Sequence, residues 1–156
     1  MKKTLLFLAF VALFISCKPN QATTIDHKAQ VEIKGNWILT KVSYVGMEYF
    51  KVNAFQIADS KCFEGSTWRF ISNNNKGQMA LTKGNCPSFS SDFVWSINQE
   101  GRFGLKIVAA GEKARKITEG YFLTIIHQSE TSFQLIDKMD IGGKMSDVTY
   151  QFEKNN

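Results

Sequence analysis

The sequence predicts an all-β fold, an eight-stranded antiparallel up-and-down barrel, preceded by an export signal and a short tether. Eight short runs rich in β-branched and aromatic residues follow one another from residue 36 onward, with turn-forming residues between them. Several runs alternate apolar and polar residues, the period of a strand with one buried face. Without residues 1–16 the chain has about 140 residues, the size of one domain.

The expected strands are short and evenly spaced, as in an antiparallel sandwich or barrel. One face is shared by Phe93, Trp95 and Ile97 in one run, and by Phe133 and Leu135 in another. Residues 46–61 are expected to form a short amphipathic helix or a long loop. Residues 111–119 are expected to form one or two helical turns. The eight strands are expected at residues 36–44, 67–72, 78–82, 92–98, 103–108, 121–127, 132–138 and 147–153.

The N-terminus is typical of a secretory signal. Lys2 and Lys3 precede an apolar run over residues 5–15, which is too short for a membrane span of about 20 residues. The residues that follow, Ser16 and Cys17, resemble the lipobox of bacterial lipoproteins, in which the Cys accepts lipid. The alternative is an ordinary secretory signal with an incidental Cys17. We therefore expect a signal peptide over residues 1–16 and a tether over residues 17–33.

A lipidated Cys17 implies attachment to a membrane. It would carry several acyl chains, and each buried methylene contributes about 0.8 kcal/mol, so that more than one chain anchors stably. Residue 18 is Lys rather than Asp. By resemblance to the sorting rule of enteric bacteria, this implies the outer membrane and leaves open whether the domain faces the periplasm or the outside.

The two other cysteines, Cys62 and Cys86, form an even pair in an oxidising compartment, where a disulfide is the default. It would close a loop of about 25 residues and contribute about 3 kcal/mol on the chain-entropy model. The histidines lie elsewhere, His27 in the tether and His127 in a strand pattern. We expect neither a metal site nor a cofactor.

The charge pattern points away from nucleic acids and from catalysis. The chain carries a formal charge of +5, of which Lys2 and Lys3 leave with the signal, and the remaining basic residues are scattered. General acid–base catalysis needs paired carboxylates or a histidine with a partner. Carboxylates near hairpin ends, at Asp137, Asp140 and Asp147, are expected to be solvated. We expect a monomer without enzymatic activity.

Several motifs resemble lipocalins, and in particular the lipocalin-like lipoproteins of Gram-negative bacteria. In lipocalins a Trp plugs one end of the barrel and a preceding Gly lets the chain enter it, which implies these roles for Gly35 and Trp37. Core lipocalins also carry a Thr-Asp-Tyr turn, a late Arg that stacks on the Trp and a C-terminal helix. No Thr-Asp-Tyr is found here, and the expected eighth strand ends too close to residue 156 to leave room for that helix. The resemblance covers residues 34–154 and also includes residues 62–70 (CFEGSTWRF), Asn73, Asn74, Gly77, residues 84–88 (GNCPS), residues 94–97 (VWSI), Tyr150, Phe152 and Glu153.

The resemblance implies non-catalytic binding or transport of a small hydrophobic ligand, such as a lipid. An eight-stranded barrel either holds one small ligand or is filled by side chains. The alternative function is therefore an interaction module of the cell envelope with a filled barrel. We expect Lys41 and Arg69 on the outer surface of the barrel; the alternative is that they lie at its open mouth. We expect residues 112–116 to form a solvated turn; the alternative is that they contact lipid headgroups or a partner. The candidate ligand contacts, for which core packing is the alternative, are Trp68, Phe70, Phe93, Trp95, Tyr121, Phe133 and Tyr150.

Overall fold

The computed structural model describes residues 26–46 and 49–155 of the 156-residue chain. The expected signal peptide, the lipid acceptor Cys17 and the first part of the tether lie outside the described residues. The sheet and its core are built entirely from residues 26–155, so this part contains what an independent domain needs. In the described part no helix is long and apolar enough to span a membrane.

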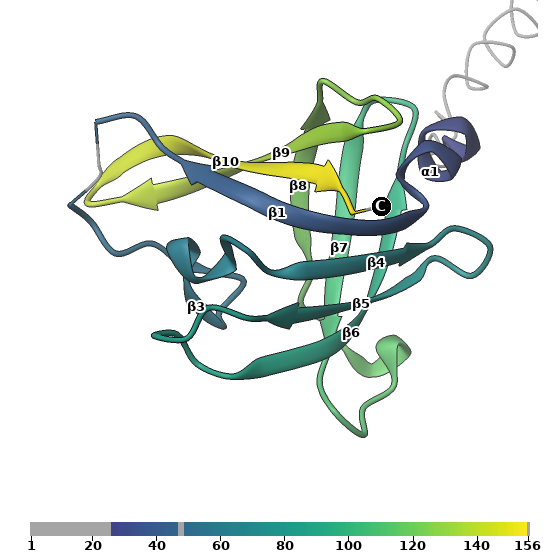
Figure 1. The fold of residues 1–156 in the computed structure, drawn as a ribbon, viewed down its shortest axis with the longest axis horizontal. Coiled ribbons are helices and arrows are strands. Elements are labelled where there is room, and N and C mark those ends of the chain that lie inside the picture. The colour runs from purple at the N-terminus through teal and green to yellow at the C-terminus, as the bar shows by residue number, and fades with distance from the viewer. Residues whose placement is uncertain (1–25, 47–48, 156) are drawn as a thin grey trace, which may run out of the picture.

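Eight antiparallel strands close into a barrel, which confirms the expected fold class (Figure 1). Around the barrel the order is β1-β10-β9-β8-β7-β6-β5-β4, and β4 pairs with β1 to close it. Each expected strand is present with its ends shifted by a few residues. The strands are β1 (Gly35–Ser43), β4 (Thr67–Ile71), β5 (Lys76–Leu81), β6 (Phe89–Ile97), β7 (Arg102–Val108), β8 (Tyr121–Ile126), β9 (Ser132–Ile141) and β10 (Lys144–Lys154).

Short elements fill the connections. The segment between β1 and β4 contains the two-stranded sheet of β2 (Asn53–Ala54) and β3 (Ala58–Asp59), followed by the 3-10 helix η2 (Ser60–Phe63). The connection from β7 to β8 contains the 3-10 turn η3 (Ala114–Lys116). In the described residues of these two connections there is no α-helix.

Helix α1 (His27–Ile33) lies within the expected tether, so part of that segment is folded. Asp26 caps the helix by accepting a hydrogen bond from the Ala29 N–H, and its own N–H donates to the Ile97 carbonyl at 2.8 Å. Ile33 is fully buried. Its short apolar face packs on the barrel, which explains why a helix of this length persists. The helix and the C-terminus lie at the same end of the barrel (Figure 1).

This end of the barrel is closed by Trp37. Its indole N–H donates to the Ile33 carbonyl at 2.6 Å, and its ring packs edge-on against Phe133 with 4.7 Å between centroids. The Lys154 ammonium lies 4.4 Å from the Trp37 ring centre. A cation over the Trp is thus present, on a lysine of β10. A Cβ at Gly35, where φ is +123°, would lie 2.9 Å from the Lys154 Nζ.

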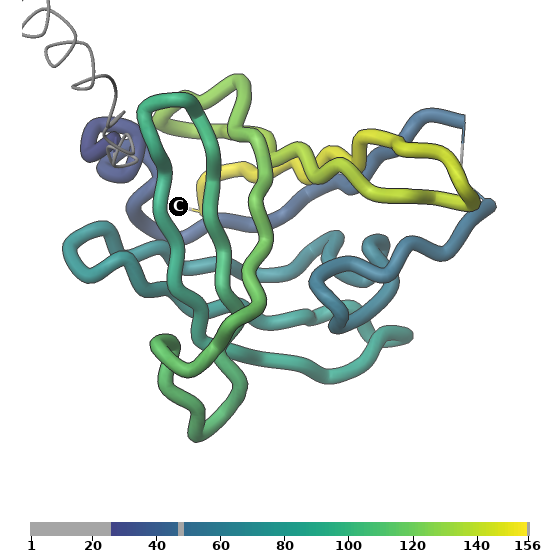
Figure 2. The backbone as a smooth tube through the Cα atoms, turned by 180° about the vertical axis from the view of Figure 1, so that it is seen from behind, coloured from purple at the N-terminus to yellow at the C-terminus, as the bar shows by residue number. Residues whose placement is uncertain are grey.

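The other end is covered by the chain between β1 and β4. We name residues 49–63 the covering segment. The tube in Figure 2 shows it beside the β9–β10 turn, far from α1. The disulfide between Cys62 and Cys86, expected from the sequence, joins it to the connection between β5 and β6. The carboxylate of Glu64, just beyond the segment, accepts a hydrogen bond from the Val42 N–H of β1.

Candidate functional site

The predicted ligand contacts divide into two groups inside the barrel. Trp68, Phe70, Phe93, Trp95 and Phe133 lie toward the Trp37 end, each at most 3% exposed. They form a packed aromatic cluster together with Phe103 and Phe152. The Phe70 ring lies 5.1 Å from the rings of both Phe93 and Trp95, and Phe133 stacks on Phe152 at 4.5 Å. In this structure these rings are the core of the barrel.

The packing of this cluster extends to the backbone of β5. Gly77 lies opposite both Phe70 and Phe93 in the sheet. A Cβ at Gly77 would lie 2.1 Å from the Phe93 ring, so the ring occupies the space of the missing side chain. The barrel near Trp37 is thus filled by side chains and leaves little freedom for rearrangement.

The other two predicted residues, Tyr121 and Tyr150, lie at the covered end. There Phe55 of the covering segment contacts both rings, at 5.1 Å from Tyr121 and 5.4 Å from Tyr150. Phe55 also packs edge-on against Phe63 at 5.3 Å. This end of the barrel is therefore closed by one inserted aromatic side chain.

The backbone that inserts Phe55 is strained. Phe55 and Gln56 have φ of +53° and +55°, in the left-handed region that bulky residues rarely adopt. Each such residue costs about 1–3 kcal/mol and persists only where its surroundings impose it. The two residues form the centre of the turn between β2 and β3, which is closed by a hydrogen bond from the Ile57 N–H to the Ala54 carbonyl at 3.0 Å. The Phe55 ring is buried, whereas the Gln56 side chain is exposed.

Two buried hydroxyl groups at this end lack a hydrogen-bond partner. They are Tyr150 Oη, on the inner face of β10, and Ser60 Oγ, in the covering segment. The two residues are 1% and 0% exposed. A buried polar group without a partner costs about 1–3 kcal/mol, so such groups are few in native proteins and call for an explanation. Burial and the nearby charge of Asp137 raise the pKa of Tyr150.

Asp137 contributes a carboxylate to the same end. It lies opposite Val148 on the inner face of β9, diagonal to Tyr150. Burial raises the pKa of Asp137, and neither a cation nor a hydrogen bond offsets it. Asp137 is therefore half-buried on the inner face, and only partly solvated. Phe133 and Leu135 both face inward on β9. Two residues further along the strand, the same alternation places Asp137 on the inner face.

The covering segment is held at its far end by a charged cluster around Glu64. Both Lys61 and Lys83 contact the Glu64 carboxylate at 3.3 Å. Burial by itself raises the pKa of Glu64, but the Val42 N–H and the two lysines together lower it below its usual value. These ion pairs are partly exposed, and each contributes little to stability. Together with the disulfide, these ion pairs hold η2 in place. Any movement of the covering segment would therefore involve residues 49–59.

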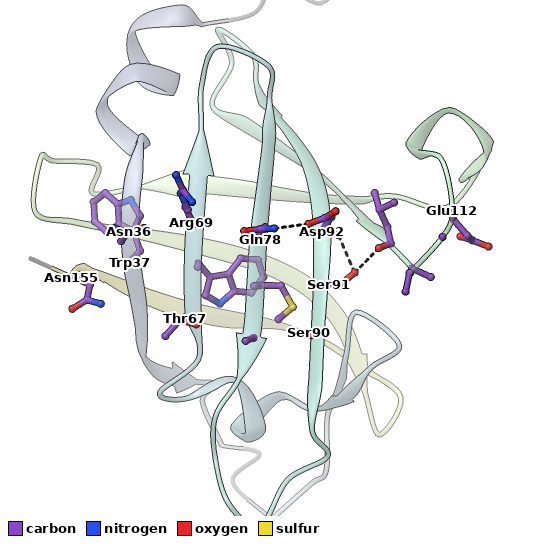
Figure 3. A pocket seen from close by; sticks show the side chains of 17 residues that line it. Asn36, Trp37, Thr67, Arg69, Gln78, Ser90, Ser91, Asp92, Glu112 and Asn155 are labelled. Atoms are coloured by element: carbon purple, nitrogen blue, oxygen red, sulfur yellow. Dashed lines mark hydrogen bonds between the residues drawn. The ribbon is translucent and has the colours of Figure 1, made fainter.

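A groove opens to solvent on the outer side of strands β1, β4, β5 and β6 (Figure 3). This groove of about 610 Å³ is open to solvent and is bordered by residues 108–112 and by Asn155. A row of polar side chains crosses four strands in register, from Asn36 through Arg69 and Gln78 to Asp92. Gln78 donates a hydrogen bond to Asp92 at 3.1 Å. We name this feature the outer groove. It places Arg69 outside the barrel, and Lys41 is exposed as well.

The described residues contain no group of three His, Cys, Asp or Glu side chains that could hold a metal ion. The groups at the covered end include aromatic rings, the hydroxyl groups of Ser60, Tyr121 and Tyr150, and the Asp137 carboxylate. Such a set can bind a ligand by hydrogen bonds and ring contacts.

Comparison with models of known protein families shows to which family the chain belongs. The family model of the lipocalin-like domain matches residues 33–135. The chain belongs to the lipocalin-like domain family. The match includes Gly35, Trp37 and both cysteines of the disulfide. No curated protein sequence matches the chain. A solved structure of a deswapped triple mutant of bovine odorant-binding protein is similar, with 14% identity, a TM-score of 0.41, and coverage of 80% of this chain and 74% of that one.

Sequence reasoning missed three residues of the covered end. Phe55 and Ser60 lie in the segment for which a helix or a loop was expected, where no periodicity showed which side chain points inward. Asp137 was assigned to the solvent because it lies near a hairpin. The lipocalin-like domain thus has its unpartnered polar groups at the end opposite Trp37.

Proposed function

We propose that this protein binds a small hydrophobic ligand without catalysis, at the Phe55 end of the barrel, and that a lipid on Cys17 tethers it to the outer membrane. The observation that carries the proposal is the buried Tyr150 hydroxyl without a partner, beside a strained Phe55. A ligand that displaces the Phe55 ring and offers a hydrogen bond would satisfy Tyr150.

The filled half of the barrel restricts where the ligand binds. The aromatic cluster around Phe70 has no room for a long chain, so the ligand occupies the region between Phe55, Tyr121 and Tyr150. This reduces the seven predicted contacts to the two tyrosines and adds Phe55, Ser60 and Asp137.

The position of α1 supports an orientation for the tethered domain. Eight residues separate Cys17 from Asp26, and an extended chain of that length spans at most about 30 Å. Asp26 lies at the Trp37 end, where its N–H is bonded to Ile97. In this proposal the closed end stays near the anchoring membrane, and the Phe55 end faces away from it.

The binding proposal is tested with a ten-carbon alcohol below its micelle concentration. Residues 18–156 are titrated with decanol by isothermal titration calorimetry, and native mass spectrometry records molecules that co-purify with the protein. We expect binding that weakens about tenfold in Tyr150→Phe, which removes one buried hydroxyl. Tyr49→Phe is the matched control, because Tyr49 is fully exposed. Absence of binding by wild type and by Phe55→Gly would refute the proposal.

The lipid anchor is tested separately from binding. Metabolic labelling with a radioactive fatty acid should label the full chain and not its Cys17→Ser variant. Label retained by that variant would contradict the anchor.

The outer groove supports a second candidate function, an interaction module of the cell envelope. Its in-register row of Asn36, Arg69, Gln78 and Asp92 offers donors and acceptors to a polar segment of another protein. Cross-linking in cells would then capture a partner that Arg69→Ala loses, whereas Tyr150→Phe keeps it. The opposite dependence would refute a role for the groove.

A further inference from the structure

We propose that the ligand of the Phe55 end is an amphiphile with an ammonium head group, and that the Asp137 carboxylate and the rings of Tyr121 and Tyr150 bind this head. The inference rests on the proposed binding function and names its ligand class. The inference starts from Asp137. Its carboxylate faces inward, but it has neither an ion pair nor a hydrogen bond with the described residues.

A charged carboxylate inside a barrel needs a partner of opposite charge or several hydrogen bonds. The three ion pairs of the described residues involve Glu64 twice and Asp147 once, and none includes Asp137. The neighbouring Lys138 cannot serve, because it points to the other face of β9 and pairs with Asp147 at 2.8 Å. The cation that would compensate Asp137 is thus absent from this part of the chain.

The groups around Asp137 fit a cation better than any other head group. In the sheet Asp137 lies diagonal to Tyr150, which is buried. Burial raises the pKa of both Tyr121 and Tyr150, and the negative charge of Asp137 adds to this, as does that of Glu119 for Tyr121. Aromatic faces attract a cation within about 6 Å, more strongly where water is excluded. An anionic head, such as a fatty-acid carboxylate, would instead be repelled by Asp137.

Phe55 now occupies the place of the ligand. Its ring fills the space between the tyrosines, and its positive φ is the cost of that position. When the head group enters, the Phe55 ring leaves, and the tyrosine faces that it covered become available to the cation. The covering segment remains attached through Cys62 and the Glu64 cluster.

The apolar tail of the ligand points outward. The interior beyond Tyr150 is filled by the aromatic cluster, whereas exposed apolar side chains surround the covered end. Phe50 is half exposed and lies against the β9–β10 turn, where a Cβ at Gly142 would be 3.1 Å from its ring. The other exposed apolar residues on the adjoining ends of β1, the covering segment and β10 are Val45, Tyr49 and Met145.

The test compares three head groups on one ten-carbon chain, below their micelle concentrations, by isothermal titration calorimetry at pH 7 with residues 18–156. We expect decylammonium, which is charged at pH 7 and whose N–H groups can donate to the Tyr150 Oη, to bind about tenfold more tightly than decanol, and decanoate more weakly than decanol. Asp137→Asn should remove the preference for ammonium over decanol. Asp147→Asn is the matched control, since it removes the same charge from the outer face of the same hairpin, and it should change neither affinity.

Different results separate the two proposals. Equal affinity for all three compounds, or an equal effect of Asp147→Asn and Asp137→Asn, overturns the ammonium head group but leaves ligand binding intact. Binding of none of the three compounds overturns both. Tighter binding of decanoate would show that the charge of Asp137 does not select the ligand.

Discussion

Replacing Phe55 by glycine and by alanine measures the strain at the covered end. Both substitutions remove a buried ring, at a cost of about 3–5 kcal/mol for a well-packed phenylalanine. They differ in the backbone. Alanine retains most of the cost of φ +53°, about 1–2 kcal/mol, whereas glycine adopts this conformation freely. Glycine adds about 0.5–1 kcal/mol of unfolded-state entropy, so we expect Phe55→Gly to be more stable than Phe55→Ala by up to about 1 kcal/mol.

The assay is urea unfolding at constant pH with the disulfide intact, followed by tryptophan fluorescence. A difference of about 1 kcal/mol shifts the midpoint by about 0.5 M at an m-value of about 2 kcal/mol/M. Gln56 provides a control without a packing contribution, because it is exposed at φ +55°. Gln56→Gly should exceed Gln56→Ala in stability by a similar amount. If alanine is the more stable replacement at both positions, this segment is not strained and the reasoning about Phe55 fails.

Three further predictions concern stability. Removing the Cys62–Cys86 disulfide by the double serine substitution should lower the unfolding free energy by about 3 kcal/mol in urea titration; an unchanged midpoint would contradict the loop-entropy estimate. Because burial raises the pKa of Asp137, wild type should lose stability as pH rises through that folded pKa, whereas Asp137→Asn should not; parallel pH profiles would refute this. Gly77→Ala should destabilise by more than 2 kcal/mol in thermal unfolding, because Phe93 must move; a loss under 0.5 kcal/mol would show a loosely packed core.

The strand pattern of the barrel was predictable because each strand has one buried and one solvated face. Phe93, Trp95 and Ile97 alternate with polar residues, so period and turn residues locate β6 without knowledge of its neighbours. The pairing of Cys62 with Cys86 was likewise predictable, since the expected assignment of Cys17 to a lipid leaves two cysteines. These are local or counting arguments, and the structure confirms the eight strands and the disulfide.

The candidate site was only partly predictable. Seven aromatic residues were assigned to the interior, but alternation does not tell whether a side chain faces other rings or a ligand. That depends on which strands meet across the barrel, as for Phe70 and Phe133 at 6.0 Å. Phe55 was missed because its inward orientation comes from two left-handed residues that no sequence period encodes.

The sequence by itself determined the class of this protein: a lipocalin-like barrel with a disulfide, expected behind a lipid anchor. These features follow from periodicity, turn residues, cysteine number and family motifs, all of which are local in the chain. Only the tertiary structure decided where the unpartnered groups meet. Phe55, Asp137 and Tyr150 are up to 95 residues apart in the chain, and they come together because closing the sheet brings β8, β9, β10 and the covering segment to one end. Burial there raises the pKa of Asp137, the carboxylate that we propose selects the ligand.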